Sequence, residues 1–174
     1  MYLTSKDAAT LLIALRSSCE NFSSVLDLIT ADYRTPTRGV IPRYVLISLG
    51  DEMGKLMGPN DFSLVRECWC CSDDDGRTVL ALALSRLAMA CPDEAYDLVN
   101  GLEECGGWQL LARWVYPVLG IWDPSYLESI GRRDMYLLSW AWYAKYVPED
   151  FDLSLDKVLG MSEVVDKLLI IALK

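Results

Sequence analysis

The sequence predicts an all-α fold, a compact single-domain bundle of seven to nine helices around a central hydrophobic helix. Apolar residues recur at intervals of three and four along most of the chain, whereas alternating β-branched segments are scarce. Prolines and glycines separate the helical stretches, and no linker is long enough to divide the chain. Because the chain has 174 residues and 52% of them are hydrophobic, residues 1–174 are expected to share one core.

The expected helices begin and end at residues that cap or interrupt helices. The first begins near Ser5, a typical N-cap residue, and either ends after Leu15 or continues past Ser17 and Ser18 to Ile29. The same signals predict a loop over 36–42 and further helices over 43–57, 61–71, 77–90, 92–102, 108–122 (bent or divided at Pro117), 133–146 and 162–173.

The helix expected over 77–90 is the central one. Its residues are apolar around nearly the whole circumference rather than along one stripe, which is typical of a helix buried on all sides. The other helices are therefore expected to pack around it.

Charge and histidine content exclude several classes of function. The 16 basic and 25 acidic residues give a formal net charge of −9, which opposes contact with nucleic acid and anionic lipid. The chain contains no histidine, so Ser-His-Asp and Cys-His catalysis and histidine-containing metal sites are excluded. No other pair of reactive side chains has a spacing that indicates an active site. We therefore expect neither an enzyme nor a cofactor.

The cysteines and the N-terminal sequence bear on the cellular compartment. Cys68, Cys70 and Cys71 crowd into one short segment, which favours free thiols in a reducing compartment. Disulfide bonds stay open as an alternative, and so does a zinc site formed by Cys68, Cys71, Cys91 and Cys105. The N-terminus lacks the features of a secretory signal, and no window suits a membrane span. A cytoplasmic protein without a membrane span is expected.

A glycine followed by an acidic residue stands in the middle of the helix expected over 43–57. Leu46, Gly50 and Asp51 have the spacing Leu-x-x-x-Gly-Asp. A glycine in mid-helix costs about 1 kcal/mol relative to alanine and usually marks a place where another backbone comes close. The segment resembles the third homology motif of the Bcl-2 family of apoptosis regulators.

Two further segments follow in the order that this family shows. The Asp-Gly-Arg sequence at 75–77 precedes the central apolar helix and is similar to the family's first homology motif. The Gly-Gly-Trp sequence at 106–108 follows two glutamates and is similar to the second homology motif. The resemblance covers about residues 43–112 and implies a Bcl-2-like arrangement of helices.

The sequence also departs from the family pattern. The family commonly has Asn-Trp before Gly-Arg, whereas Asp74 and Asp75 stand here, so an aromatic anchor is missing. An alternative register places the Gly-Arg pair at Gly131 and Arg132 and would make the aromatic helix over 133–146 the central one.

The resemblance implies a hydrophobic groove that binds the amphipathic helix of pro-death Bcl-2 family partners. Arg77 would pair with the partner's aspartate, and Gly76 would leave room for the bound helix. The apolar lining would comprise Leu49, Met53, Leu56, Phe62, Val65, Val79 and Leu80. A chain of this kind resembles virus-encoded pro-survival members that sequester such partners in the host cytoplasm. The opposite, pro-death direction stays open.

A second hypothesis requires no groove. An acidic all-helical viral or phage inhibitor would use its net charge of −9 to occupy a basic site on an unrelated target. Exposed charges are screened over about 8–10 Å near physiological ionic strength, so loss of activity in moderate salt would favour this hypothesis. Exposed aromatic surface would also be compatible with a homodimer.

Overall fold

The structure, a computed structural model, describes residues 3–115, 118 and 119. All regular elements within these residues are helical, which confirms the all-α fold class. The described residues up to Leu110 form one compact unit, and the described residues from Leu111 onward belong to a second. The expected helices over 133–146 and 162–173, the expected bend at Pro117 and the Gly131-Arg132 register lie outside the described residues.

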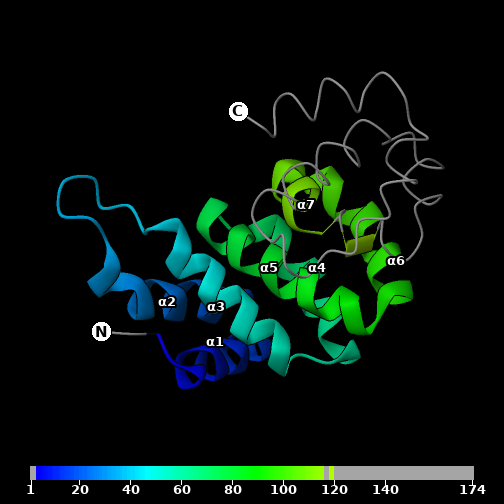
Figure 1. Cartoon of the computed structure of the whole chain (residues 1–174), viewed down its shortest axis with the longest axis horizontal. Helices are drawn as coiled ribbons and strands as arrows, with labels where there is room; N and C mark the ends of the chain where they lie inside the picture. The colour runs from blue at the N-terminus through cyan, green and yellow to red at the C-terminus, as the bar shows by residue number, and fades with distance from the viewer. Residues whose placement is uncertain (1–2, 116–117, 120–174) are drawn as a thin grey trace, which may run out of the picture. The chain divides into compact units, whose positions relative to one another are not determined.

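Seven α-helices and three short 3-10 helices follow one another along the described part of the chain (Figure 1). The α-helices are α1 (Ser5–Ser17), α2 (Cys19–Thr30), α3 (Arg43–Leu56), α4 (Phe62–Cys71), α5 (Asp74–Ala90), α6 (Pro92–Leu102) and α7 (Trp108–Trp114). The 3-10 helices are η1 (Ala31–Tyr33), η2 (Pro59–Asp61) and η3 (Glu103–Cys105). Within the described residues, no helix combines the length and the apolar character that a membrane span requires.

Two hydroxyl caps define the first helices. The backbone of Ser18 is extended, and its hydroxyl accepts a hydrogen bond from the Asn21 N–H at 3.0 Å, so the chain breaks here into α1 and α2. Thr4, rather than the expected Ser5, caps α1. The Thr4 hydroxyl accepts from the Asp7 N–H at 3.4 Å, and the Thr4 N–H donates to the Asp7 carboxylate at 2.8 Å. Such reciprocal bonds satisfy backbone groups that have no partner within the helix.

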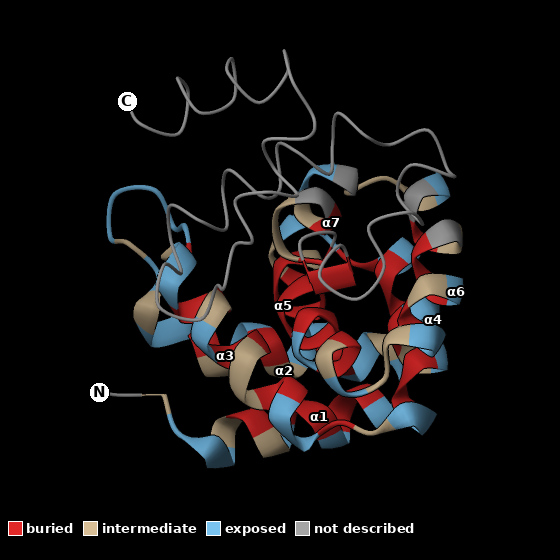
Figure 2. Cartoon of the chain, turned by 45° about the vertical axis from the view of Figure 1, so that its right-hand side comes forward, coloured by how far each residue is buried: buried red, intermediate tan, exposed pale blue. Residues whose placement is uncertain are grey.

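Helix α5 is the most buried helix of the first unit (Figure 2). Buried side chains occur on all sides of it between Thr78 and Ala88, as the apolar circumference of this segment predicts. Helix α3 packs against α5 more extensively than any other pair of described helices does, and α4 and α6 also contact it. The expected central helix is therefore present, although it begins at Asp74 rather than Arg77.

Two glycines allow α3 to approach α5 closely. A Cβ atom at Gly50 would lie 2.5 Å from both the Val79 carbonyl oxygen and the Leu82 Cβ atom. A Cβ atom at Gly54 would lie 2.7 Å from the Ala83 carbonyl oxygen. These distances leave no room for a side chain on either residue, which confirms the close backbone approach predicted at Gly50.

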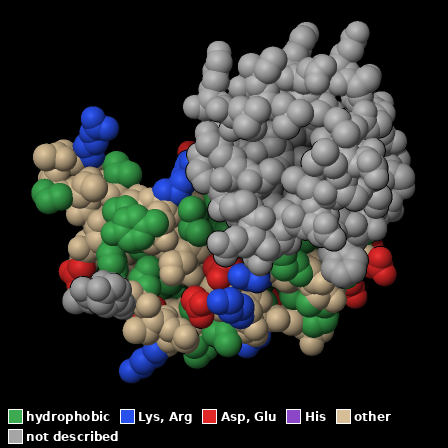
Figure 3. All heavy atoms as spheres, viewed as in Figure 1, with side chains coloured by type: hydrophobic (Ala, Val, Ile, Leu, Met, Phe, Trp, Pro, Cys, Tyr) green, Lys and Arg blue, Asp and Glu red, His purple; other side chains and the backbone are tan. Residues whose placement is uncertain are grey.

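Charged side chains gather over the second half of α3 (Figure 3). Asp51 forms an ion pair with Arg86 of α5 and another with Lys55, whose Nζ atom lies 3.2 Å from the Asp51 carboxylate. Burial alone would raise the pKa of the Asp51 carboxyl, but Arg86 and Lys55 outweigh burial and hold this pKa below its ordinary value. Asp51 is therefore committed to contacts within the first unit.

Four of the six cysteines form disulfide bonds, which corrects the expectation of free thiols. Cys19 of α2 is bonded to Cys68 of α4, and Cys70 of α4 is bonded to Cys105 at the end of η3. Residues two positions apart on a helix are rotated by about 200° around its axis, so their side chains point to nearly opposite sides. Cys68 and Cys70 therefore reach different partners in spite of their close spacing.

The zinc alternative is also wrong. Cys68 and Cys105 are bonded to other cysteines, whereas Cys71 and Cys91 are free. The described residues contain no cluster of three or more side chains that could hold a metal ion.

A bidentate ion pair joins α1 to η2. Arg16 donates from Nε and Nη2 to the two carboxylate oxygens of Asp61, each at 2.9 Å, and the Gly58 N–H donates to the same carboxylate at 2.9 Å. The Asp61 side chain is only 5% exposed, whereas that of Arg16 is half exposed. Arg16 holds the pKa of Asp61 below its ordinary value even though burial opposes this shift, and the Gly58 N–H acts in the same direction.

The Asp61 carboxylate is expected to stabilise the protein in a pH-dependent way. Asp61→Asn should lower the free energy of unfolding at pH 7 by about 1–2 kcal/mol, a value reduced for the exposure of Arg16. Because the folded-state pKa is lowered, this contribution is present above the ordinary pKa near 4 and is lost as the pH falls through the lowered value. Urea unfolding of both proteins at pH 7, 5 and 3 measures the difference. A difference that stays constant down to pH 3 would show that the carboxylate charge is not its source.

Candidate functional site

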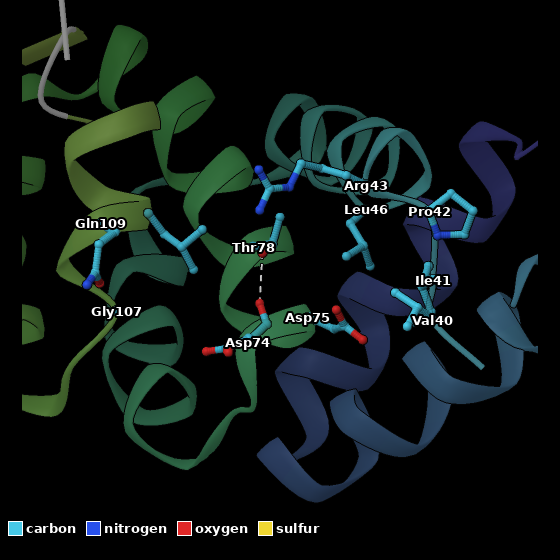
Figure 4. A pocket seen from close by; sticks show the side chains of 11 residues that line it. Val40, Ile41, Pro42, Arg43, Leu46, Asp74, Asp75, Thr78, Gly107 and Gln109 are labelled. Atoms are coloured by element: carbon cyan, nitrogen blue, oxygen red, sulfur yellow. Dashed lines mark hydrogen bonds between the residues drawn. The ribbon is translucent and has the colours of Figure 1, made fainter. Parts of the chain in front are cut away.

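A pocket of about 560 Å³ opens in the first unit between the start of α3, the start of α5 and residues 107–110 (Figure 4). Its lining residues are Val40, Ile41, Pro42, Arg43, Leu46, Asp74, Asp75, Thr78, Gly107, Gln109 and Leu110. Leu46, Asp75 and Gly107 each belong to one of the three segments that resemble homology motifs. Three stretches that are distant in the sequence therefore surround one pocket.

The start of α3 supplies apolar surface and one cation. Ile41 and Leu46 are buried, whereas Val40 is 53% exposed at the rim. Helix α3 begins at Arg43, with no side-chain cap and no acidic residue in its first turn. Arg43 is exposed and has no hydrogen bond or ion pair to another residue that the structure describes. A helix N-terminus carries a positive partial charge, so this end of the pocket favours an anionic group.

The start of α5 supplies carboxylates. The Asp73 side chain is used as a cap and accepts a hydrogen bond from the Gly76 N–H at 2.8 Å. The Thr78 hydroxyl donates to the Asp74 carbonyl oxygen at 2.7 Å, as the dashed line in Figure 4 shows. The Asp75 carboxylate is half-buried, and no described residue gives it a hydrogen bond or an ion pair. Burial raises the pKa of Asp75, and the Asp73 carboxylate adds to this effect.

Arg77 and Trp69 fasten the segment that leads to the third wall. Arg77 donates from Nε to the Trp69 carbonyl oxygen and from Nη2 to the Cys105 carbonyl oxygen, each at 3.0 Å. The Trp69 indole N–H donates to the Gly106 carbonyl oxygen at 2.9 Å. Together with the Cys70–Cys105 disulfide, these bonds attach the segment to α4 and α5.

The Gly106-Gly107 pair makes the turn into the third wall. Both residues lie in the left-handed region, with φ of 86° and 76°, where glycine is favoured. A Cβ atom at Gly107 would also lie 2.9 Å from the Trp69 ring. The local backbone therefore requires both glycines before Gln109 and Leu110 can line the pocket.

The pocket has opposite charges on two of its sides. Figure 4 shows Leu46 pointing from α3 toward the start of α5, with the Arg43 guanidinium extending in the direction of Thr78. Asp75 lies on the side of the view where Val40 and Ile41 also lie. The structure has no ion pair between Arg43 and Asp74 or Asp75 among its described residues. An apolar floor with a free cation and free carboxylates at its rim suits an amphipathic segment.

None of the nine residues predicted to form the groove lines this pocket. Six of them are core residues packed between helices, namely Leu49, Met53, Phe62, Val65, Val79 and Leu80. Leu56 is 47% exposed near the end of α3. The six could contact a partner helix only if that helix displaced a packed neighbour. Their role in partner binding stays a prediction.

Gly76 and Arg77 have structural contacts of their own. A Cβ atom at Gly76 would lie 3.0 Å from the Ser72 Cβ atom, so this glycine gives room to the turn between α4 and α5. Arg77 already donates to the Trp69 and Cys105 carbonyl oxygens and would have to leave them to meet a partner's aspartate.

Sequence reasoning missed Arg43 and Asp75. A cation at the first position of a helix opposes the helix dipole, so Arg43 directly after Pro42 was a usable signal. Asp75 was noted as a departure from the family pattern, and the structure shows that Asp73 makes the capping bond. The partial burial of Asp75 arises in a pocket that residues of α3 also line, and a contact between two helices is not visible in a local sequence pattern.

The comparisons with known proteins bring no relative. No protein-family model matches the chain, and neither a curated protein nor a solved structure matches it.

Proposed function

We propose that the protein is an apoptosis regulator that binds the amphipathic helix of pro-death Bcl-2 family partners and sequesters them, as a virus-encoded pro-survival member would. The observation that carries the proposal is the convergence of the three motif-bearing segments around one pocket. In this proposal the helices have a Bcl-2-like arrangement in which α3, α5 and α7 carry the third, first and second homology motifs. The protein acts without catalysis in the cytoplasm of a host cell.

The pocket has the chemistry that an amphipathic helix needs. Val40 and Leu110 offer accessible apolar surface to its anchors, and the buried Ile41 and Leu46 form the floor behind them. Tyr44, which follows Arg43 in α3 and does not line the pocket, is 70% exposed. Tyrosine and arginine are common among the residues that dominate binding energy at interfaces. The start of α3 is therefore the side on which we expect most of the binding energy.

Arg43 takes the role that the resemblance assigns to Arg77. Arg43 is exposed at the pocket and unpaired among the described residues, whereas Arg77 is engaged with two carbonyl oxygens. A charge-assisted hydrogen bond from Arg43 to an aspartate of the bound helix would form without breaking a contact within the fold.

Fluorescence-polarisation titration with a panel of labelled homology-three peptides from pro-death proteins tests the proposal. Submicromolar binding to some peptides is expected, and Arg43→Glu should weaken it at least about tenfold. Lys6→Glu is the matched control because Lys6 is also a cation in the first turn of a helix and does not line the pocket. The control should bind like the unchanged protein.

Two outcomes would contradict the proposal. If a folded protein binds no peptide of the panel, the pro-survival function is wrong. If Arg77→Glu abolishes binding in a protein that keeps its thermal stability while Arg43→Glu does not, the bound helix lies in the groove predicted from sequence and the pocket is not the site.

A second candidate function rests on the excess of acidic side chains. With a net charge of −9 and the carboxylates of Asp73, Asp74 and Asp75 at the start of α5, the protein would occupy a basic site on an unrelated target. This interaction would weaken sharply between low and moderate salt, whereas burial of apolar anchors in the pocket would persist.

A further inference from the structure

The pocket contains a carboxylate that no residue of the described chain satisfies. Of the three consecutive aspartates, Asp73 bonds to the Gly76 N–H and Asp74 is exposed, so Asp75 alone is half-buried within the pocket wall. Arg34 attracts the Asp75 carboxylate and by itself lowers the pKa of Asp75, but it forms no hydrogen bond or ion pair with Asp75. Arg34 forms an ion pair with Asp27 at 2.8 Å and donates to the Gly39 carbonyl oxygen at 2.8 Å.

The surroundings of Asp75 favour the arrival of a cation. Asp75 lines the same pocket as Ile41 and Leu46, which are buried and cannot donate hydrogen bonds from their side chains. A half-buried carboxylate that accepts no hydrogen bond loses hydration, and the positive end of α5 and the attraction of Arg34 do not replace a direct ion pair. A ligand that carries an ammonium or guanidinium group beside its apolar anchors would offset this loss of hydration by forming an ion pair with Asp75.

We infer that the occupant of the pocket is an amphipathic helix of a partner protein that places a lysine or arginine side chain on Asp75. The inference rests on the proposed function and adds the charge pattern of the partner. Arg43 and Asp75 lie on different sides of the pocket, so a helix with one acidic and one basic residue flanking its apolar anchors can satisfy both. This complementarity fixes the direction in which the helix lies, because the reverse direction brings like charges together.

A scan of the basic residues of one bound peptide tests the inference. The probe is the tightest binder of the homology-three panel, and each of its lysines and arginines is replaced in turn by glutamine. At one peptide position, the replacement is expected to weaken binding to the unchanged protein about fivefold to tenfold. The same replacement is expected to weaken binding to the Asp75→Asn variant less than about twofold. Asp75→Asn itself should bind the unchanged peptide about fivefold to tenfold more weakly.

Two further variants serve as controls. Asp93→Asn removes an exposed carboxylate from the same position in the first turn of α6 that Asp75 has in α5, and it should reproduce the unchanged protein at every peptide position. Asp75→Glu keeps the charge and should retain the dependence on the same basic residue. The thermal unfolding midpoints of all variants are compared first, so that unfolding is excluded as the cause of a loss of binding.

The inference and the proposed function fail in different ways. If the panel binds but each basic residue contributes equally to binding of the unchanged protein and of Asp75→Asn, the inference is overturned and the proposed function stands. If no peptide binds, the proposed function fails and the inference with it. A dimer in sedimentation that Asp75→Asn dissociates would overturn the inference in favour of a second copy of the chain as occupant.

Discussion

Replacing Cys70 and Cys105 together by serine is expected to lower the free energy of unfolding by about 4 kcal/mol. The disulfide closes a loop between positions 35 residues apart, and most of its effect comes from restricting the unfolded chain. A similar loss is expected for Cys19→Ala with Cys68→Ala, whose bond spans 49 residues. Urea unfolding in the absence and presence of reductant measures both effects.

Alkylation shows whether the four cysteines are disulfide-bonded or are free thiols. Unfolded, unreduced protein should react with iodoacetamide at Cys71 and Cys91 alone, and reduced protein should react at all six cysteines. Cys71→Ser is the control for the first variant, because it changes the neighbouring exposed residue without breaking a disulfide, and it should leave the stability unchanged. Six reactive thiols without reductant would restore the free-thiol interpretation and remove the basis of the expected stability loss.

The disulfides also bear on the cytoplasmic location that we propose. Glutathione and thioredoxin keep most cytosolic thiols reduced. In that compartment the segment before α7 would depend on Arg77 and Trp69 alone for its attachment. Peptide binding measured in reductant is therefore the condition that matches the proposed function.

Gly50→Ala is expected to lower the free energy of unfolding by about 2–3 kcal/mol. Alanine is the better helix former by about 1 kcal/mol, but its Cβ atom would lie 2.5 Å from the Val79 carbonyl oxygen, which is backbone and cannot rotate away. Relief requires α3 to move away from α5 along the most extensive helix contact in the described part of the chain. Thermal and urea unfolding measure the loss.

Gly101→Ala is the matched control for Gly50→Ala. Gly101 also lies in a helix, but a Cβ atom there would meet only the Arg66 Nε atom, at 3.8 Å. The substitution should therefore raise stability by about 0.5–1 kcal/mol through helix propensity. Equal effects at the two glycines would show that α3 and α5 are not in close contact.

The periodicity of apolar residues predicted most of the helices in the described chain, because the residues that form one buried face of a helix lie close together in the sequence. The segment 77–90 is the clearest case, since its apolar circumference matches the burial of α5. The break at Ser18 was less visible because Ser18 both ends one helix and begins another, and the apolar pattern continues across it. The disulfide pairing was out of reach because it depends on how α2, α4 and η3 meet.

The pocket was not predicted from the sequence, which placed the groove on other residues of α3, α4 and α5. The three motif segments do surround one pocket, yet the apolar stripe of α3 that includes Leu49 and Met53 faces the core. Helical spacing shows that such residues share a face, but it does not show whether a neighbouring helix or a ligand covers that face. The prediction for Arg77 has a related difficulty. Arg77 donates hydrogen bonds to backbone carbonyl oxygens, and because every residue has such an oxygen, the sequence does not indicate which of them an arginine will contact.

The close packing of α3 on α5 bears on whether the protein could act in the pro-death or in the pro-survival direction. In the proposed function, α3 carries the third homology motif, which pro-death members of the Bcl-2 family present to a partner. Here Gly50 and Gly54 lie against the α5 backbone, and Asp51 is held by Arg86 and Lys55. Release of α3 would open the core, so its amide hydrogens should exchange with solvent only through global unfolding. If the proposed function is right, the protein therefore binds a partner's helix in the pocket and does not present α3 to a partner.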